Sequence, residues 1–165
     1  MLRGEASMPK AGLLSSNNDG GKDPYACLRL ENQFCFPLYA AAKEVVRRYQ
    51  PLLSALNLTY TQYIVLMVLW ELQETNVSEL GARLYLDSGT LTPLLRKLEN
   101  KGYISRHRSE NDKRELLVSI TKEGLALRDS ALQIPYELQS CIDLPQQDLI
   151  ELRRISRELL DSCKS

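Results

Sequence analysis

Cysteines are the residues of this 165-residue chain with the widest chemical repertoire, and one of the four is well placed for thiol chemistry. Pro37 removes a helical amide and pushes Phe36 away from helical angles, so a long helical pattern either begins near Cys35 or is kinked there. Both arrangements place Cys35 at or beside a helix N-terminus. A helix N-terminus favours the thiolate, which is the form that reacts with oxidants. The apolar neighbours Phe34, Phe36 and Leu38 favour an organic peroxide over hydrogen peroxide. The residue types therefore indicate a redox-reactive Cys35, with a buried structural cysteine as the ordinary alternative.

Other kinds of reactive site find little support in the residues. Hydrolysis by a cysteine nucleophile needs a histidine base, and the one histidine, His107, lies in a basic predicted strand. A thiol peroxidase using Cys35 would need a fold such as the thioredoxin-like βαβ pattern, which the sequence does not offer. Ligand-type side chains do not cluster at a coordinating spacing. We therefore expect no metal, no cofactor and no enzyme activity.

Length and composition suit a compact core that needs no disulfide or metal, because 44% of the residues are hydrophobic. The longest apolar run, 64–70, is far too short to span a membrane, so we expect a cytoplasmic protein with no membrane partner. Thiols stay reduced there unless redox chemistry is their purpose. Residues 1–24 are rich in Gly, Ser, Asn, Asp and Lys, which predicts a flexible tail to which we assign no function.

The stretch 86–102 predicts an amphipathic helix over 88–101. Its buried stripe has the i, i+3, i+4, i+7 spacing, and consists of Leu91, Leu94, Leu95 and Leu98. Asp87 or Ser88 can cap the start, and Gly102 can end the helix. At roughly 20 Å its length suits a DNA major groove. An amphipathic helix with a merely solvated basic face is the ordinary alternative.

A charged hairpin is predicted directly after this helix. Residues 103–108 and 114–120 resemble strands, and 109–113 form a polar turn. A helix followed by such a hairpin is typical of a winged helix-turn-helix. From Arg96 to Arg114 there are seven Lys or Arg against three acids, a formal charge of +4 in a chain whose net charge is zero. This concentration of charge favours binding to a phosphate backbone.

The predicted DNA-binding residues follow from this arrangement. We expect four residues to face the groove, namely Ser88, Thr90, Thr92 and Arg96. Further basic contacts are expected from Lys97, Arg106 and Arg108. Basic residues that bind phosphates position the protein on DNA without specifying its sequence. Arg114 on the wing is suited to insertion in a narrow minor groove. Asp112 is expected to orient Arg114, and Asp87 to orient Arg106.

The rest of the chain predicts supporting helices. A helical pattern runs from about 28 to 56, the sequence Thr59-Tyr60-Thr61-Gln62 is a capping box that opens a helix through Leu72, and 76–86 form a short helix. After the hairpin, one helix starts at Thr121 and is disturbed at Pro135, and another starts at about 143–146. Their apolar stripes exceed what one small winged domain can cover, so we expect a homodimer.

The predicted fold class is mainly α (α+β): a winged helix-turn-helix with a two-stranded wing and a helical dimerisation layer from both ends of the chain. The expected domains are a tail (1–24), an N-terminal helix carrying the sensor cysteine (25–58), a winged helix-turn-helix that binds DNA (59–120) and C-terminal dimerisation helices (121–165).

Several runs of residues together resemble the MarR family of winged-helix repressors, and most of all its organic hydroperoxide resistance (OhrR) branch. The resemblance covers about residues 28–160. It is carried by Leu30-Glu31-Asn32-Gln33-Phe34-Cys35-Phe36, Leu58-Thr59-Tyr60-Thr61-Gln62-Tyr63, Val68-Leu69-Trp70-Glu71, Val77-Ser78-Glu79-Leu80-Gly81, the run 86–95, and the wing segment 106–114. The run Leu-Asp-Ser-Gly-Thr-Leu-Thr-Pro-Leu-Leu joined to the earlier Asn-Gln-x-Cys is highly specific.

This resemblance implies a homodimer that binds an inverted-repeat operator, represses a peroxidase gene and loses DNA affinity when an organic hydroperoxide oxidises its cysteine. Cys35 matches the family's reactive cysteine, and Tyr49 and Tyr60 match two tyrosines that hydrogen-bond its sulfur from the partner subunit. Cys141 lies where two-cysteine members have the thiol that resolves the sulfenic acid as an intersubunit disulfide. Pro37 departs from the family's usual residue.

Alternatives stay open at each of these positions. Tyr49 and Tyr60 could be ordinary core aromatics, and a small thiol could resolve the sulfenic acid if Cys141 does not. Cys27 and Cys163 are expected to be bystanders. The alternative function is a MarR-type repressor released by a phenolic ligand or by another oxidant or electrophile.

Overall fold

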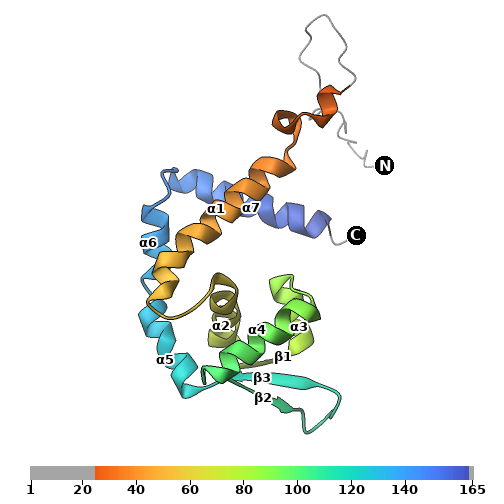
Figure 1. The fold of residues 1–165 in the computed structure, drawn as a ribbon, viewed down its shortest axis with the longest axis vertical. Helices are drawn as coiled ribbons and strands as arrows, with labels where there is room; N and C mark the ends of the chain where they lie inside the picture. The colour runs from red at the N-terminus through yellow and green to blue at the C-terminus, as the bar shows by residue number, and fades with distance from the viewer. Residues whose placement is uncertain (1–24, 164–165) are drawn as a thin grey trace, which may run out of the picture. The chain divides into compact units, whose positions relative to one another are not determined.

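The structure, a computed structural model, describes residues 25–163, so the predicted tail at 1–24 lies outside the described residues. The chain divides into two units, 1–47 and 48–165. The elements appear in Figure 1, and in chain order they are η1 (Ala26–Leu28), η2 (Leu30–Asn32), α1 (Cys35–Ser54), α2 (Tyr60–Leu72), β1 (Glu74–Asn76), α3 (Val77–Leu84), α4 (Ser88–Asn100), β2 (Ile104–Arg108), β3 (Leu116–Ile120), α5 (Lys122–Ala131), α6 (Ile134–Ser140) and α7 (Gln146–Ser162).

Helix α1 begins at Cys35, which is the first of the two arrangements that Pro37 allowed. Pro37 lies in the first turn, where a backbone amide has no partner within the helix in any case. The chain before Cys35 forms short 3₁₀ turns instead of the α-helix predicted from about residue 28. Side-chain amides compete with the helical backbone there, since Asn32 donates to the carbonyl of Ala26 at 2.7 Å and Gln33 to that of Cys27 at 2.5 Å.

Helix α2 lies at the centre of the hydrophobic core, as its apolar sequence predicts. The predicted capping box is confirmed: Thr59 Oγ1 accepts the backbone N–H of Gln62 at 3.3 Å, and Gln62 Oε1 accepts the N–H of Thr59 at 3.2 Å. Val65, Leu66 and Leu69 are completely buried. The helix therefore supplies the wall on which α3, α4 and the sheet pack.

The sheet of the described region has three antiparallel strands in the order β1-β3-β2. The two wing strands were predicted, and they pair from Ile104 opposite Ile120 to Arg108 opposite Leu116. Strand β1 was not predicted, because three residues are too few to show an alternating pattern. It pairs Thr75 with Val118, so the base of the wing is attached to the start of α3.

The C-terminal part forms three helices where two were predicted. The expected disturbance at Pro135 is a complete break: α5 ends at Ala131, and α6 begins at Ile134 with Pro135 in its first turn. None of the residues of α7, all of which the structure describes, is buried within the chain. No helix in the described part of the chain is long and apolar enough to span a membrane.

Candidate nucleic-acid interface and redox centre

The two helices of the helix-turn-helix, α3 and α4, are each capped by an acidic or amide side chain. Asn76 Oδ1 accepts the N–H of Glu79 at 2.7 Å, and Asp87 Oδ1 accepts the N–H of Thr90 at 2.9 Å. The hydroxyl of Thr90 also donates to Asp87 Oδ2 at 2.8 Å. These bonds lower the pKa of Asp87, so its carboxylate is charged at neutral pH beside the positive end of the α4 dipole. Of the two predicted caps, Asp87 is the one used.

The turn between α3 and α4 depends on a small residue. A Cβ atom on Gly81 would lie 2.8 Å from the carbonyl oxygen of Leu86, which is backbone and cannot give way easily. Tyr85 adopts a left-handed conformation with φ of 54° to turn the chain. This close approach holds the angle at which α4 leaves α3.

The predicted inner stripe of α4 is confirmed, since its four leucines are at most 8% exposed. The residues expected to face a groove are exposed, namely Ser88, Thr90, Thr92 and Arg96, and so is the basic residue Lys97. The hydroxyl of Thr92 donates to the carbonyl of Ser88 at 2.7 Å, as that of Thr90 donates to Asp87. Because both hydroxyl protons are engaged, these threonines present acceptor oxygens and methyl groups to whatever approaches the helix.

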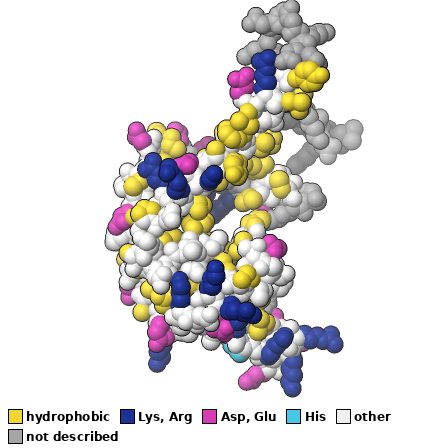
Figure 2. Space-filling model, viewed as in Figure 1, with side chains coloured by type: hydrophobic (Ala, Val, Ile, Leu, Met, Phe, Trp, Pro, Cys, Tyr) yellow, Lys and Arg dark blue, Asp and Glu magenta, His cyan; other side chains and the backbone are white. Residues whose placement is uncertain are grey.

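The tip of the wing is ordered by its own polar groups. Asp112 Oδ1 accepts the backbone N–H of Arg114 at 2.9 Å, and the carbonyl of Arg114 accepts from Arg108 Nη1 at 3.1 Å. Asp112 therefore holds the backbone of Arg114, and the orientation of the Arg114 side chain by Asp112 stays a prediction. The Arg114 side chain is exposed, and in Figure 2 Lys and Arg side chains gather over α4 and the wing.

Arg106 is held by Glu99, and the expected pairing with Asp87 is wrong. Its Nε donates to Glu99 Oε2 at 3.0 Å, and its Nη2 bonds the same oxygen. The hydrogen bonds from Arg106 lower the pKa of Glu99. Asp87 is occupied by Thr90 at the other end of α4, whereas Glu99 lies in its last turn beside β2. Arg106 thus ties the wing to α4, with only 19% of its side chain exposed.

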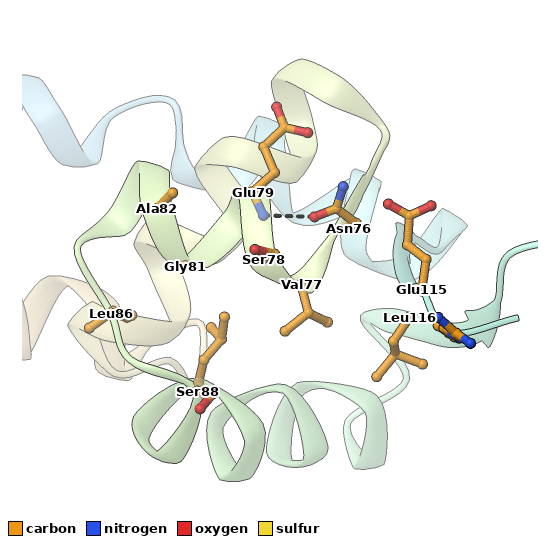
Figure 3. A pocket seen from close by; sticks show the side chains of 12 residues that line it. Asn76, Val77, Ser78, Glu79, Gly81, Ala82, Leu86, Ser88, Glu115 and Leu116 are labelled. Carbon is orange, nitrogen blue, oxygen red and sulfur yellow. Dashed lines mark hydrogen bonds between the residues drawn. The ribbon is translucent and has the colours of Figure 1, made fainter. Parts of the chain in front are cut away.

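An open pocket of about 750 Å³ lies between the start of α3, the start of α4 and residues 114–116, where the chain leaves the wing turn and enters β3 (Figure 3). Its walls include the apolar side chains of Val77, Leu91 and Leu116. The charged residues in its lining are two glutamates, Glu79 and Glu115, and one arginine, Arg114. The pocket therefore lacks the positive charge of a phosphate site, and the basic character of this surface comes from the outer face of α4 and the wing.

Cys35 and Cys141, the two cysteines singled out from the sequence, are both exposed. Cys35 is the first residue of α1, and Cys141 follows the last residue of α6, so each thiol lies at a helix end. The carbonyl of Cys141 accepts from Arg48 Nη1 at 3.4 Å, which fixes the end of α6. Cys27 and Cys163 are exposed as well.

Tyr49 and Tyr60 lie together, and the structure adds a third tyrosine that was missed. The ring centroid of Tyr49 lies 4.9 Å from that of Tyr60 and 5.9 Å from that of Tyr63. Burial, with the nearby Tyr60 and Tyr63, raises the pKa of Tyr49 to about 12, and burial also raises the pKa of Tyr60 and Tyr63. All three hydroxyls are therefore protonated donors at neutral pH. The i, i+3 spacing of Tyr60 and Tyr63 on one helix was the available signal.

Comparison with known proteins identifies the family. The family described as transcriptional regulator SarA/Rot matches residues 47–130. The organic hydroperoxide resistance transcriptional regulator of Bacillus subtilis (strain 168) is 44% identical over 135 residues, which is 82% of this chain and 92% of that protein. This chain belongs to the MarR/SarA family of winged-helix transcriptional regulators. The predicted resemblance and fold class are thus confirmed, and this family regulates transcription and is not a class of enzymes.

Solved structures of MarR/SarA regulators have the same architecture. Reduced AbfR bound to DNA, a Staphylococcus epidermidis protein, is 34% identical, with a TM-score of 0.71 over 83% of this chain and 94% of that one. Disulfide-formed AbfR is 33% identical, with a TM-score of 0.59 over 81% of this chain and 93% of that one. One related regulator has therefore been seen both reduced on DNA and with a disulfide.

Proposed function

We propose that this regulator is a homodimeric repressor that binds an inverted-repeat operator and is released when an organic hydroperoxide oxidises Cys35. The observation that carries the proposal is the position of Cys35, the exposed first residue of α1 in a chain 44% identical to a regulator named for organic hydroperoxide resistance. The disulfide-formed state of AbfR supports thiol oxidation as the type of signal.

The proposed chemistry takes place at Cys35 in two steps. The thiolate sulfur attacks the outer oxygen of the hydroperoxide, the O–O bond breaks, and the alkoxide leaves as an alcohol after taking a proton, so that the cysteine becomes a sulfenic acid. The thiol of Cys141 from the other subunit then attacks the oxidised sulfur. An S–S bond forms, the S–O bond breaks, and water leaves.

The tyrosine cluster supports a sensor shared between two subunits. Tyr49 and Tyr60 match the two tyrosines that the resemblance places beside the reactive cysteine of the other subunit, so they would serve Cys35 of a partner chain. Their hydroxyls are protonated donors, and a hydrogen-bond donor stabilises a sulfur anion.

DNA binding is assigned to α4 and the wing. The exposed outer face of α4 would enter the major groove with Ser88, Thr90, Thr92 and Arg96, while Lys97 and Arg108 would contact phosphates. Arg114 would enter the adjacent minor groove from the ordered wing tip. The reduced AbfR–DNA complex, with its TM-score of 0.71, supports this mode of binding.

Dimerisation is assigned to the helices outside the winged domain. In α7, Ile150, Leu152 and Ile155 are 44–50% exposed, and in α1 the apolar residues Phe36, Leu38 and Val46 are 39–41% exposed. A helix with exposed apolar residues at these positions is stabilised when a second copy covers them. A two-fold dimer would present two α4 helices to the two halves of an inverted repeat.

The test is operator binding by the reduced dimer, titrated with cumene hydroperoxide and in parallel with hydrogen peroxide. We expect binding to be lost at near-stoichiometric organic peroxide, and a non-reducing intact-mass measurement to show a doubled mass. Cys35→Ser should bind the operator and ignore peroxide. Cys141→Ser should still be oxidised but lose the doubled mass.

Cys163→Ser is the matched control, because Cys163 is also exposed at a helix end and should leave both readouts unchanged. Release of the Cys35→Ser dimer by peroxide would refute the assignment of Cys35. A doubled mass that persists in Cys141→Ser would refute only the assignment of Cys141.

A further inference from the structure

Lys101 belongs to the basic stretch around α4, but its ammonium group is used inside the protein. It follows the last residue of α4, and Nζ donates to the side-chain oxygen of Gln62 at 3.1 Å and also to the carbonyl of Asn57. Asn57 and Gln62 flank the start of α2. Lys101 thus joins the C-terminal end of the helix assigned to the major groove to the beginning of the central helix.

The two groups that accept hydrogen bonds from Lys101 are themselves held in place by other hydrogen bonds. Gln62 is only 3% exposed, and its Oε1 also accepts the N–H of Thr59 in the capping box. Asn57 has a left-handed conformation with φ of 53°, and its N–H bonds the carbonyl of Ser54 at the end of α1. One ammonium group therefore reaches both the turn after α1 and the cap of α2.

The backbone of Lys101, the donor residue, is attached to α4 on one side and to the wing on the other. The backbone N–H of Lys101 bonds the carbonyl of Lys97 at 3.2 Å, so the residue continues the last turn of α4. Gly102 follows with φ of 75° and directs the chain into β2. A shift of Lys101 would therefore move the end of α4 and the start of the wing together.

The turn that Lys101 holds is also where the tyrosine cluster lies. Tyr60 is the first residue of α2, next to Thr59 of the capping box, and its ring lies 4.9 Å from that of Tyr49. Partial burial of the ammonium group and the charge of Lys97 lower the pKa of Lys101, which agrees with a lysine whose ammonium group bonds the protein. Lys101 is thus a short physical connection between the proposed sensor and α4.

We propose that Lys101 is a positioning residue that ties α4 to the start of α2, and that it transmits a rearrangement around Tyr60 to the DNA-reading helix. The transmission rests on the function proposed above. The competing role is a direct phosphate contact, which its place in the basic stretch would suggest. The two roles differ in their response to salt, because each lost phosphate contact reduces the salt dependence of DNA binding.

The first experiment measures operator affinity of the reduced dimer at several salt concentrations for Lys101→Met and for the matched control Lys97→Met. Lys97 is an exposed cation four residues earlier on α4, and each dimer carries two copies of it. Its loss should therefore reduce the slope of log affinity against log salt by about two. Lys101→Met should weaken binding with the wild-type slope. A slope reduced as in Lys97→Met would overturn the positioning role.

The second experiment compares operator affinity before and after oxidation by cumene hydroperoxide. The ratio of the two affinities measures the coupling between Cys35 and DNA. In Lys101→Met we expect this ratio to fall by roughly 2- to 30-fold relative to wild type. A wild-type ratio in a variant that still folds would overturn the transmission.

Two variants of Gln62 keep the test decisive if Lys101→Met folds poorly. Gln62→Glu retains an acceptor for Thr59 and Lys101 and should preserve the coupling, whereas Gln62→Leu removes that acceptor and should reduce it. Equal coupling in both variants would overturn the proposal. A wild-type dimer that ignores hydroperoxide would refute the proposed function and the transmission with it, while the salt slopes would still decide the positioning role.

Discussion

Replacing Gly124 with alanine tests a close approach of two backbone segments, where the start of the wing meets α5. A methyl group at position 124 would lie 2.0 Å from the carbonyl oxygen of Tyr103 and 2.8 Å from Cδ1 of Ile120, whereas ordinary contacts begin at 3.4 Å. The Ile120 side chain can rotate. The Tyr103 carbonyl is backbone at the start of the wing, so α5 has to move away from it.

The expected loss of stability follows from the contacts that this movement breaks. It stretches the bond from the N–H of Thr121 to the carbonyl of Tyr103, at 3.1 Å, and the bond from Trp70 Nε1 to the carbonyl of Gly124, at 2.8 Å. Each bond contributes about 1 kcal/mol, and overpacking adds about 1–3 kcal/mol. The better helix propensity of alanine offsets about 0.5–1 kcal/mol. The net destabilisation should be about 2–4 kcal/mol, or roughly 5–15 °C in Tm.

Urea unfolding followed by the fluorescence of Trp70, the one tryptophan, measures this change directly. All variants are compared at one protein concentration, because the stability of a dimer depends on concentration. Gly89→Ala is the matched control: it lies in the first turn of α4, and its methyl would meet only the Asp87 side chain, at 3.0 Å. If Gly124→Ala proved as stable as Gly89→Ala, the packing argument would be refuted.

Three further predictions concern the interface and the sensor. Because the pKa of Asp87 is lowered in the folded protein, its carboxylate stabilises the fold fully above the ordinary aspartate pKa, and this stabilisation is lost as the pH falls through the lowered pKa. The difference in free energy of unfolding between wild type and Asp87→Ala should therefore shrink in acid, as urea titrations at several pH values would show. Glu99→Gln should lower the free energy of unfolding by about 1 kcal/mol, because Glu99 forms a half-buried ion pair with Arg106. A double-mutant cycle with Arg106→Met should give a coupling energy of that size, and additive effects of the two substitutions would contradict the prediction. Tyr49→Phe should keep the ring packing but slow the oxidation of Cys35 by cumene hydroperoxide, whereas an unchanged rate of oxidation would exclude Tyr49 as a donor to the reacting sulfur.

The sequence was sufficient for the parts of the interface whose causes are local. The leucine stripe of α4, its cap at Asp87 and the capping box at Thr59 all depend on residues within one or two turns of each other, and each is present in the structure. Pro37 likewise limited the start of α1 to two possibilities, and α1 begins at Cys35. Periodicity and capping act at short range, so they can be recognised without the fold.

The features that were missed or misassigned depend on contacts between distant segments. Strand β1 exists because β3, more than forty residues later, supplies its hydrogen bonds. Arg106 was assigned to Asp87, but antiparallel pairing of the wing places it beside Glu99 at the other end of α4. Lys101 belongs to a basic stretch in the sequence, and only the packing of α4 against α2 brings its ammonium group to Gln62. Charge in a sequence therefore does not separate a DNA contact from an internal tie.

Packing alone gives the tyrosine cluster properties that suit the proposed sensor. Burial raises the pKa of Tyr49 to about 12, and it raises that of Tyr60 as well, so both hydroxyls keep their protons throughout the range in which a cysteine titrates. A protonated hydroxyl donates a stronger hydrogen bond to a thiolate than to a neutral thiol, so these two tyrosines would favour the thiolate, which is the reactive form of the sulfur. The cluster is next to the cap of α2 that Lys101 holds, so a change in what these hydroxyls bind would act on the segment joined to α4. In the proposed function, the same burial that keeps the tyrosines protonated thus also places them where a chemical change at sulfur could alter the position of α4, the helix proposed to enter the major groove.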